Sequence, residues 1–366
     1  MTELKELSDI SPDPRPFYER WQETEGLDVI KGWFIEDLRK VPLKPWKRKG
    51  GFGVFINLEG TGGENDAYVC EIPPGGSLLP QRHLFEEVIF ILEGRGSTTV
   101  WHEGGSKQSF EWQPGSLFSP PLNTWHQHFN AQGNKVARYL AVTLAPPMMN
   151  TFHNVDFIFN NPFQFTDRFG GRQNYFNSDG RLCKAPDARI RIWETNFIPD
   201  ILKVDLIEWK ERGAGGKSMS FQLSENSMAA HTSSFPVGTY KKAHRHHAGA
   251  HVTILSGEGY TLMWQEGDRP ERYDWRVGSM VVPPEMWWHQ HFNLGRGPAN
   301  YLAIHGRISR KYRSGLKGWK LDQDVKGGGD QIEYGDEDPM IWEMFVEELA
   351  KRGVQNLMPK IEKKKR

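Results

Sequence analysis

Short apolar runs cut by glycine and proline dominate the chain between residues 52 and 144. The segment 73–76, for example, reads Pro-Pro-Gly-Gly and lies between two such runs. Runs of this length with turn residues at both ends are typical of β-strands. The pattern predicts strands at residues 54–58, 67–72, 88–92, 97–101, 117–119 and 137–144.

The same pattern returns in the second half of the chain. It predicts further strands at residues 218–223, 251–255, 260–264, 280–282 and 301–304. We therefore expect one β-barrel over residues 51–150 and another over residues 216–310, joined by a less regular linker at residues 151–215. Within that linker, residues 190–193 and 201–209 read as strands or short helical pieces.

Helical spacing is confined to the two ends. Apolar residues from Phe17 to Leu38 recur at roughly helical intervals with a break near Gly26, which predicts two short helices within an arm at residues 1–50. In the C-terminal segment, residues 311–366, Asp338-Pro339 offers an N-cap followed by proline, and Gly353 offers an end. We expect a helix between them that covers apolar surface.

An internal repeat supports the two-barrel interpretation. Residues 115–130 and 278–293 both begin with Gly-Ser, carry Pro-Pro in the middle and end in Trp-His-Gln-His-Phe-Asn. Residue 126 corresponds to residue 289, an offset of 163 that also relates His83 to His246. A repeat of this length indicates two copies of a domain rather than a solenoid.

The second copy carries three histidines that could bind one metal ion. His244 and His246 are two residues apart and therefore share a face if the segment is extended, while His289 comes from a separate strand. Neutral imidazole binds iron, copper, nickel and zinc, and three such ligands leave coordination positions open, as catalytic metals require.

The first copy carries a different ligand set. Gln81, His83 and Glu87 share a face, and His126 takes the place of His289. Two imidazoles, a carboxylate and a weak amide ligand could also bind a divalent metal. The neighbouring Glu86 and His251 have odd spacing and should face away, although a bulge would make His251 a fourth ligand in place of Ala250.

These motifs resemble those of the cupin superfamily. Its first motif reads Gly-x5-His-x-His-x3/4-Glu-x6-Gly, and its second reads Gly-x5-Pro-x-Gly-x2-His-x3-Asn. The first motif is matched by Gly75, Gln81, His83, Glu87 and Gly94, and again by Gly238, His244, His246, Ala250 and Gly257, with Gln81 and Ala250 as departures. The second motif is matched by Gly115, Pro121, His126 and Asn130, and by Gly278, Pro284, His289 and Asn293. The resemblance implies an all-β fold of two tandem cupin barrels (double-stranded β-helix, or jelly-roll) with peripheral helices.

Within the two-barrel cupins, the second copy is similar to the gentisate 1,2-dioxygenase and salicylate dioxygenase group. The resemblance implies a non-haem Fe(II) dioxygenase that uses O2 to open a small aromatic substrate, with His244, His246 and His289 as metal ligands. It also implies a substrate-contacting role for His291. By position, His128 is the counterpart of His291 in the first copy. For both histidines, a role in packing alone is the alternative interpretation.

Two other functions fit the same residues. The first is a redox-silent lyase, isomerase or decarboxylase with manganese, nickel or zinc, in which Glu87 serves as base or ligand. The second is a non-enzymatic binding protein. The free-energy cost of burying imidazoles without partners argues against it.

Composition limits the kinds of binding partner and the cellular compartment that we expect for this protein. The formal net charge is zero, which gives no general attraction to nucleic acid or to an anionic membrane. Two cysteines cannot form a disulfide framework, no signal peptide is recognisable and no apolar run could span a bilayer. We expect a cytoplasmic homo-oligomer that acts on a small molecule.

Overall fold

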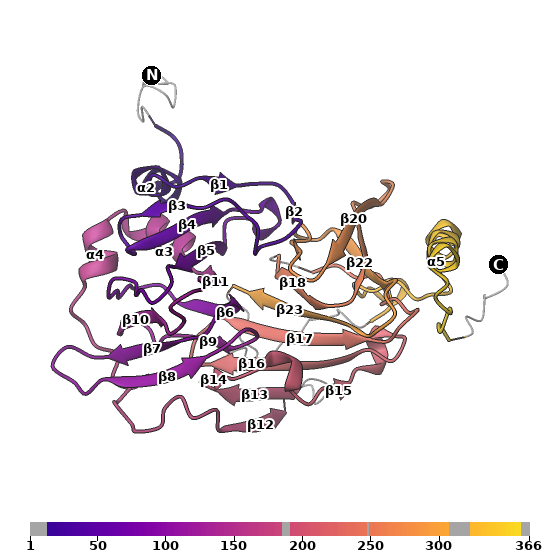
Figure 1. The fold of residues 1–366 in the computed structure, drawn as a ribbon. Coiled ribbons are helices and arrows are strands. Elements are labelled where there is room, and N and C mark those ends of the chain that lie inside the picture. The colour runs from indigo at the N-terminus through magenta and orange to yellow at the C-terminus, as the bar shows by residue number, and fades with distance from the viewer. Residues whose placement is uncertain (1–12, 185–190, 247–248, 307–322, 360–366) are drawn as a thin grey trace, which may run out of the picture.

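The computed structural model describes residues 13–184, 191–246, 249–306 and 323–359 (Figure 1). Each half of the chain forms one large and one small β-sheet. This arrangement confirms the predicted all-β fold of two tandem jelly-roll barrels with peripheral helices.

In the first barrel, an eight-stranded sheet faces a three-stranded sheet. The large sheet has the order β1-β4-β5-β11-β6-β9-β14, with β3 on β4, and the small sheet has the order β10-β7-β8. Its strands are β1 (Val29–Ile30), β3 (Lys44–Trp46), β4 (Gly51–Ile56), β5 (Asp66–Ile72), β6 (Glu87–Glu93), β7 (Gly96–Trp101), β8 (Gln108–Trp112), β9 (Leu117–Phe118), β10 (Trp125–Asn130), β11 (Ala137–Thr143) and β14 (Phe197–Ile198).

The second barrel repeats this plan. Its nine-stranded sheet has the order β12-β13-β16-β17-β23-β18-β21-β2, with β15 on β16, and its small sheet has the order β20-β19-β22. Its strands are β2 (Phe34–Ile35), β12 (Gly180–Lys184), β13 (Arg191–Thr195), β15 (Ile207–Glu208), β16 (Lys217–Leu223), β17 (Ala229–Phe235), β18 (His251–Ser256), β19 (Glu258–Trp264), β20 (Glu271–Arg276), β21 (Met280–Val281), β22 (Trp288–Asn293) and β23 (Ala299–His305). Short 3-10 turns lie at η1 (Glu59–Thr61), η2 (Ile201–Lys203), η3 (Lys210–Arg212) and η4 (Val325–Gly327).

Several strands, among them β8, β17 and β20, lack the sequence pattern that revealed the others. The edge strands β8 and β20 set their aromatic residues among polar and charged ones, and β17 is largely buried but composed mainly of alanine, serine and threonine. Neighbouring strands supply their hydrogen bonds, so they do not need a strong apolar run of their own.

The two barrels exchange short strands. In β2, Phe34 lies opposite Val281 of the second barrel, whereas in β14 Phe197 lies opposite Phe118 of the first. Both partners are displaced by the same 163 residues, so the exchange follows the internal repeat. Residues that the sequence assigned to an arm and a linker thus contribute strands to both large sheets, and each barrel is completed by the other half of the chain.

The prediction of a second helix in the arm is wrong. Helix α2 (Phe17–Glu25) ends at Gly26, whose φ of 71° suits glycine, but the following residues form β1 and β2. Their backbone groups pair with strands of the two large sheets, and this tertiary pairing overrides the local helical spacing. Two further helices, α3 (Ala145–Phe152) and α4 (Val155–Asn160), lie beside α2 on one side of the first barrel (Figure 1).

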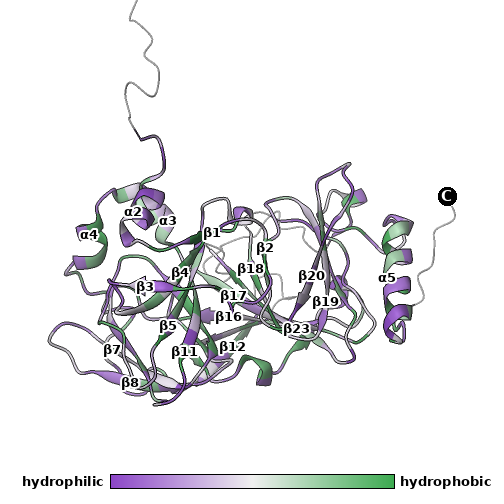
Figure 2. Cartoon of the chain, turned by 45° about the horizontal axis from the view of Figure 1, so that its top comes forward, coloured by the Kyte–Doolittle hydropathy of each residue, from purple (hydrophilic) through white to green (hydrophobic). Residues whose placement is uncertain are grey.

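The C-terminal helix α5 (Pro339–Arg352) is confirmed. The Asp338 side chain accepts a hydrogen bond from the Met340 N–H, and Gly353 ends the helix with φ of 61°. The helix is amphipathic, with hydrophobic and hydrophilic stretches alternating along it (Figure 2). Its buried face packs on the cluster that contains Trp288 and Phe292. None of the described helices has the length and hydrophobicity needed to cross a membrane.

A partly buried carboxyl group just before α5 should make stability depend on pH. Glu337 accepts hydrogen bonds from the Tyr240 hydroxyl and the Gln290 amide, yet burial outweighs them and raises its pKa from 4.5 to about 7. The folded protein therefore retains a proton that the unfolded chain releases between these pH values. The stability associated with Glu337 should fall as pH rises from about 4.5 to about 7, by no more than roughly 3 kcal/mol.

We expect Glu337→Gln to flatten this part of the stability profile, because the amide does not ionise. Urea unfolding of both proteins between pH 4.5 and 8 measures the effect. Parallel profiles for the variant and the wild-type protein would contradict it.

Candidate metal centres

Three side chains of the first barrel converge on one point. The ligand atoms of His83, Glu87 and His126 all lie within 4.8 Å of one another. Glu87 Oε1 is 3.4 Å from His83 Nε2 and 3.4 Å from His126 Nε2. All three side chains are buried, and none of these three atoms has a hydrogen-bond partner in the structure. Orphaned buried polar atoms that face one another are what a metal site requires, because burying them without a partner is costly.

Backbone carbonyl groups orient both histidines. His83 Nδ1 lies 2.7 Å from the Phe85 carbonyl oxygen, and His126 Nδ1 lies 3.1 Å from the Thr124 carbonyl oxygen. A carbonyl accepts only from N–H, so it fixes the proton on Nδ1 and leaves Nε2 as the ligand atom. Glu87 begins β6 and His126 lies in β10, so the large and small sheets each supply part of the site.

The structure gives the predicted amide ligand another partner. Gln81 pairs with His126 through the backbone, but its side-chain Oε1 accepts a hydrogen bond of 2.8 Å from Lys49 Nζ. The amide oxygen is thus bound to an ammonium group, and its second lone pair has no partner assigned by this hydrogen bond.

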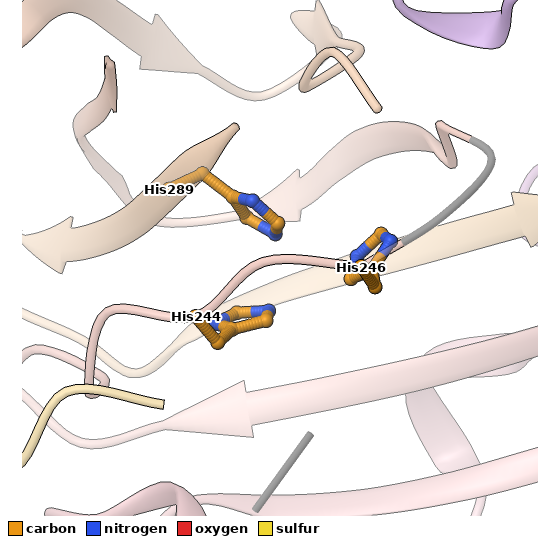
Figure 3. A group of neighbouring side chains, drawn as sticks. All are labelled: His244, His246 and His289. Atoms are coloured by element: carbon orange, nitrogen blue, oxygen red, sulfur yellow. The ribbon is translucent and has the colours of Figure 1, made fainter. Parts of the chain in front are cut away.

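The second barrel gathers its three predicted histidines in the same way. The ligand atoms of His244, His246 and His289 lie within 4.8 Å of one another. Figure 3 shows the three rings around a shared space between β22, which carries His289, and the segment that carries the other two. The His244 Nδ1 and His289 Nδ1 atoms lie 3.2 Å and 3.1 Å from the carbonyl oxygens of Lys242 and Trp287. The two barrels thus orient the corresponding His126 and His289 in the same way, each by the carbonyl oxygen two residues earlier.

Electrostatics keep His126, His244, His289 and Glu87 in the protonation states that bind metals. Burial holds the pKa of His244 and of His289 well below the usual range and lowers the pKa of His126 to about 3, so these imidazoles stay neutral. Burial alone would raise the pKa of Glu87. The adjacent His83 and the Lys49 charge outweigh burial and hold that pKa well below its usual range. The first centre therefore has two imidazoles and a carboxylate, and the second has three imidazoles.

No carboxylate stands beside the histidines at the position of Glu87 in the second barrel, where the buried Ala250 lies. His251 is not part of the convergent set of His244, His246 and His289, and its Nδ1 lies 3.2 Å from the side-chain nitrogen of Asn65. Glu86 also faces away from the metal site, as predicted. It accepts hydrogen bonds from Arg168 and from the Ser227 N–H of the other barrel.

His128 and His291, the residues with an implied substrate role, occupy equivalent places beside the two centres. Each Nδ1 lies 2.8 Å from a threonine hydroxyl, that of Thr98 or of Thr261. The ring centroid of His128 is 5.5 Å from that of His126, and that of His291 is 5.9 Å from that of His289. Both are therefore held next to the ligands and outside the convergent sets, a position from which they could contact a bound molecule.

Sequence reasoning missed a chain of hydrogen bonds in the first barrel. Lys49 Nζ donates to the Tyr68 hydroxyl at 2.9 Å, and that hydroxyl donates to Glu87 Oε2 at 2.7 Å. Lys49 lies in a basic stretch that resembles a linker, and no local pattern distinguishes it from Lys47. In the second barrel, His231 stands at the position of Tyr68 and contacts His305, at 3.0 Å between ring nitrogens.

A pocket opens beside the first centre. Its cavity volume is about 20 Å³. The barrel contributes Lys49, Tyr68, Gln81 and His83, and the covering helices contribute Tyr18 and Trp21 of α2 and Phe159 of α4. The pocket thus reaches a candidate metal ligand and a buried cation together.

Removing one ligand from each centre should change the metal content independently. We expect His83→Ala and His246→Ala each to lose the metal of its own barrel, since two remaining ligands hold an ion poorly. Elemental analysis after reconstitution with Mn²⁺, Fe²⁺ or Zn²⁺ measures this. The exposed His153, replaced in His153→Asn, serves as the control. Unchanged metal content in either alanine variant would show that its centre does not bind.

Comparison with known proteins agrees with this geometry. Residues 68–143, from β5 to β11, match the family described as Cupin domain. No curated protein matches the chain in sequence.

Solved structures of oxalate decarboxylase share the fold. One, from a study of its substrate binding mode and reaction specificity, has 15% identity over 76% of this chain and 78% of its own, with a TM-score of 0.51. Another, the Bacillus subtilis enzyme at pH 4.6, has 15% identity over 76% of each chain, with a TM-score of 0.50. Identities this low establish likeness of fold alone. Residues 68–143 thus resemble a cupin domain in sequence, and the chain resembles oxalate decarboxylase in fold.

Proposed function

We propose that the protein is a metal-dependent enzyme whose first barrel carries out a redox-neutral reaction on a small carboxylic acid, of the decarboxylase or lyase class. The observation that carries this proposal is the placement of His83, Glu87 and His126 beside a pocket that also contains a buried lysine. Metal and cation together suit a substrate that is an anion and becomes more negative as it reacts.

The residues of the first barrel have complementary roles in such a reaction. A divalent ion held by His83, Glu87 and His126 would act as a Lewis acid. Lys49 supplies an N–H donor at the pocket, and the Tyr68 hydroxyl connects Lys49 to Glu87. A carbanion formed by loss of CO2 or by proton abstraction must be protonated, and Lys49 Nζ is a proton donor within the pocket. Aromatic walls exclude water and strengthen these electrostatic interactions.

The metal itself does not decide the reaction. Two imidazoles with one carboxylate can hold iron, manganese or zinc, and such a set also occurs in iron oxygenases. Oxygen stoichiometry is the deciding quantity, because a dioxygenase consumes one O2 for each substrate molecule and a redox-neutral enzyme consumes none.

The test uses the full chain reconstituted with each metal and a panel of carboxylic acids. The panel includes oxalate, the substrate named for the structurally similar decarboxylases, and aromatic acids. We expect product, followed by 13C NMR and CO2 release, without matching O2 uptake at an oxygen electrode. Glu87→Gln should lower turnover by about 100-fold or more, since it removes a charged ligand. The matched variant His289→Ala, in the other barrel, should retain activity. One O2 consumed per product would overturn the proposal.

A second candidate function rests on the second barrel. Its three neutral imidazoles leave an Fe(II) ion with its full charge, and His291 lies beside them. This arrangement favours a dioxygenase that acts on a gentisate-like or salicylate-like aromatic acid with O2. We expect that activity to show equimolar O2 uptake with hydroxy aromatic acids and to disappear in His289→Ala but not in His83→Ala. The opposite pattern in the two variants would exclude it.

A further inference from the structure

Lys49 is a buried cation without a carboxylate in direct contact. Its side chain is 4% exposed, and its Nζ donates to Gln81 Oε1 at 2.8 Å and to the Tyr68 hydroxyl at 2.9 Å. An ammonium group has three N–H donors, so these two neutral acceptors leave one donor for a further partner. Lys49 lines the pocket, so that partner can come from within it.

The other cation of the pocket is already neutralised. Arg48 Nη2 lies 2.6 Å from Glu25 Oε1, and its guanidinium group stacks over the Phe159 ring at 4.3 Å. Arg48 therefore closes part of the pocket wall without contributing net charge. Lys49 is the cation of this pocket with a free donor.

A metal ion would leave Lys49 in greater need of an anion. The carboxylate that balances Lys49 is Glu87, which it reaches through the Tyr68 hydroxyl. If Glu87 binds a divalent ion, its negative charge neutralises part of the charge of that ion and no longer compensates Lys49. A buried ammonium group without a counter-charge is costly, and an entering anion removes that cost.

The walls of the pocket favour a flat apolar body on that anion. They include the rings of Trp21, Trp46, Phe55, Phe85 and Phe159. Aromatic rings contribute large apolar contact and prefer stacked or edge-to-face partners.

We propose that Lys49 is the carboxylate-binding residue of the first-barrel pocket and that it selects acids whose carboxylate is attached to a planar, apolar body. This inference rests on the proposed function, since it names the substrate class of the same site. It concerns binding, however, and can be tested without turnover.

Benzoate and benzamide are suitable probes, because they share shape and differ in charge. Isothermal titration calorimetry on the metal-containing protein measures both dissociation constants, and elemental analysis confirms that metal content stays constant. We expect the wild-type protein to prefer benzoate by at least about 10-fold, since hydrogen bonds between charged groups are stronger than neutral ones. Lys49→Met should weaken benzoate binding by about 10- to 100-fold and leave benzamide binding within about 3-fold.

The second barrel offers a matched control. Lys241 is also 4% exposed, and its Nζ donates to a tyrosine hydroxyl, that of Tyr301, at 3.0 Å. Lys241→Met removes an equivalent buried charge far from the pocket and should leave both constants unchanged. Lys49→Arg retains the charge and should retain the preference for benzoate.

The possible results separate cleanly. Absence of a preference for benzoate in the wild-type protein overturns the inference, and this outcome is readable even if Lys49→Met fails to fold. A preference that survives in Lys49→Met also overturns it, because the metal would then be binding the carboxylate. Loss of the preference in Lys49→Met, together with equimolar O2 consumption in the turnover assay, would leave this inference standing and overturn only the redox-neutral function.

Discussion

The structure depends on how the barrels hold imidazole rings with one nitrogen free. In both halves, a backbone carbonyl oxygen within two residues of the histidine takes the Nδ1 proton, as Thr124 does for His126 and Trp287 does for His289. In the first barrel, His83 Nε2 and His126 Nε2 are buried without a hydrogen-bond partner, and both lie 3.4 Å from Glu87 Oε1. Burial is unfavourable for such groups unless an ion satisfies them, so the energetic cost of the apo site is the reason for expecting a metal.

The exchange of β2 and β14 gives that geometry a rigid support. Each short strand pairs with a strand inside the second ligand motif of the opposite barrel, ahead of its histidine. Beside this pairing, Leu38 N–H donates to the Gly278 carbonyl at 2.8 Å and Ile201 N–H donates to the Gly115 carbonyl at 2.9 Å. Neither barrel has its full set of strands without the other half of the chain. The two centres are therefore linked through the backbone, although their ligand sets differ.

This difference makes the two barrels unequal chemically. Glu87 gives the first centre a negative ligand and connects it through Tyr68 to Lys49, whereas Ala250 leaves the second centre with neutral ligands alone. The first barrel thus combines a candidate metal site that has one negatively charged ligand with a separate buried cation and an aromatic pocket. One fold, repeated within the chain, thus carries two different chemical environments.

The sequence by itself determined the repeat, most of the strands, the C-terminal helix and the residues His83, Glu87, His126, His244, His246 and His289 as the convergent set, because strand periodicity and motif spacing are local properties. It could not show that residues after Gly26 would form strands rather than a helix, since their partners lie in β4 and, far along the chain, β21. The hydrogen bond between the Gln81 side chain and Lys49, and the position of Lys49 in the pocket, are features that only the tertiary structure shows. The physical reason is that hydrogen bonds and charge compensation between distant segments leave no periodic trace in the sequence.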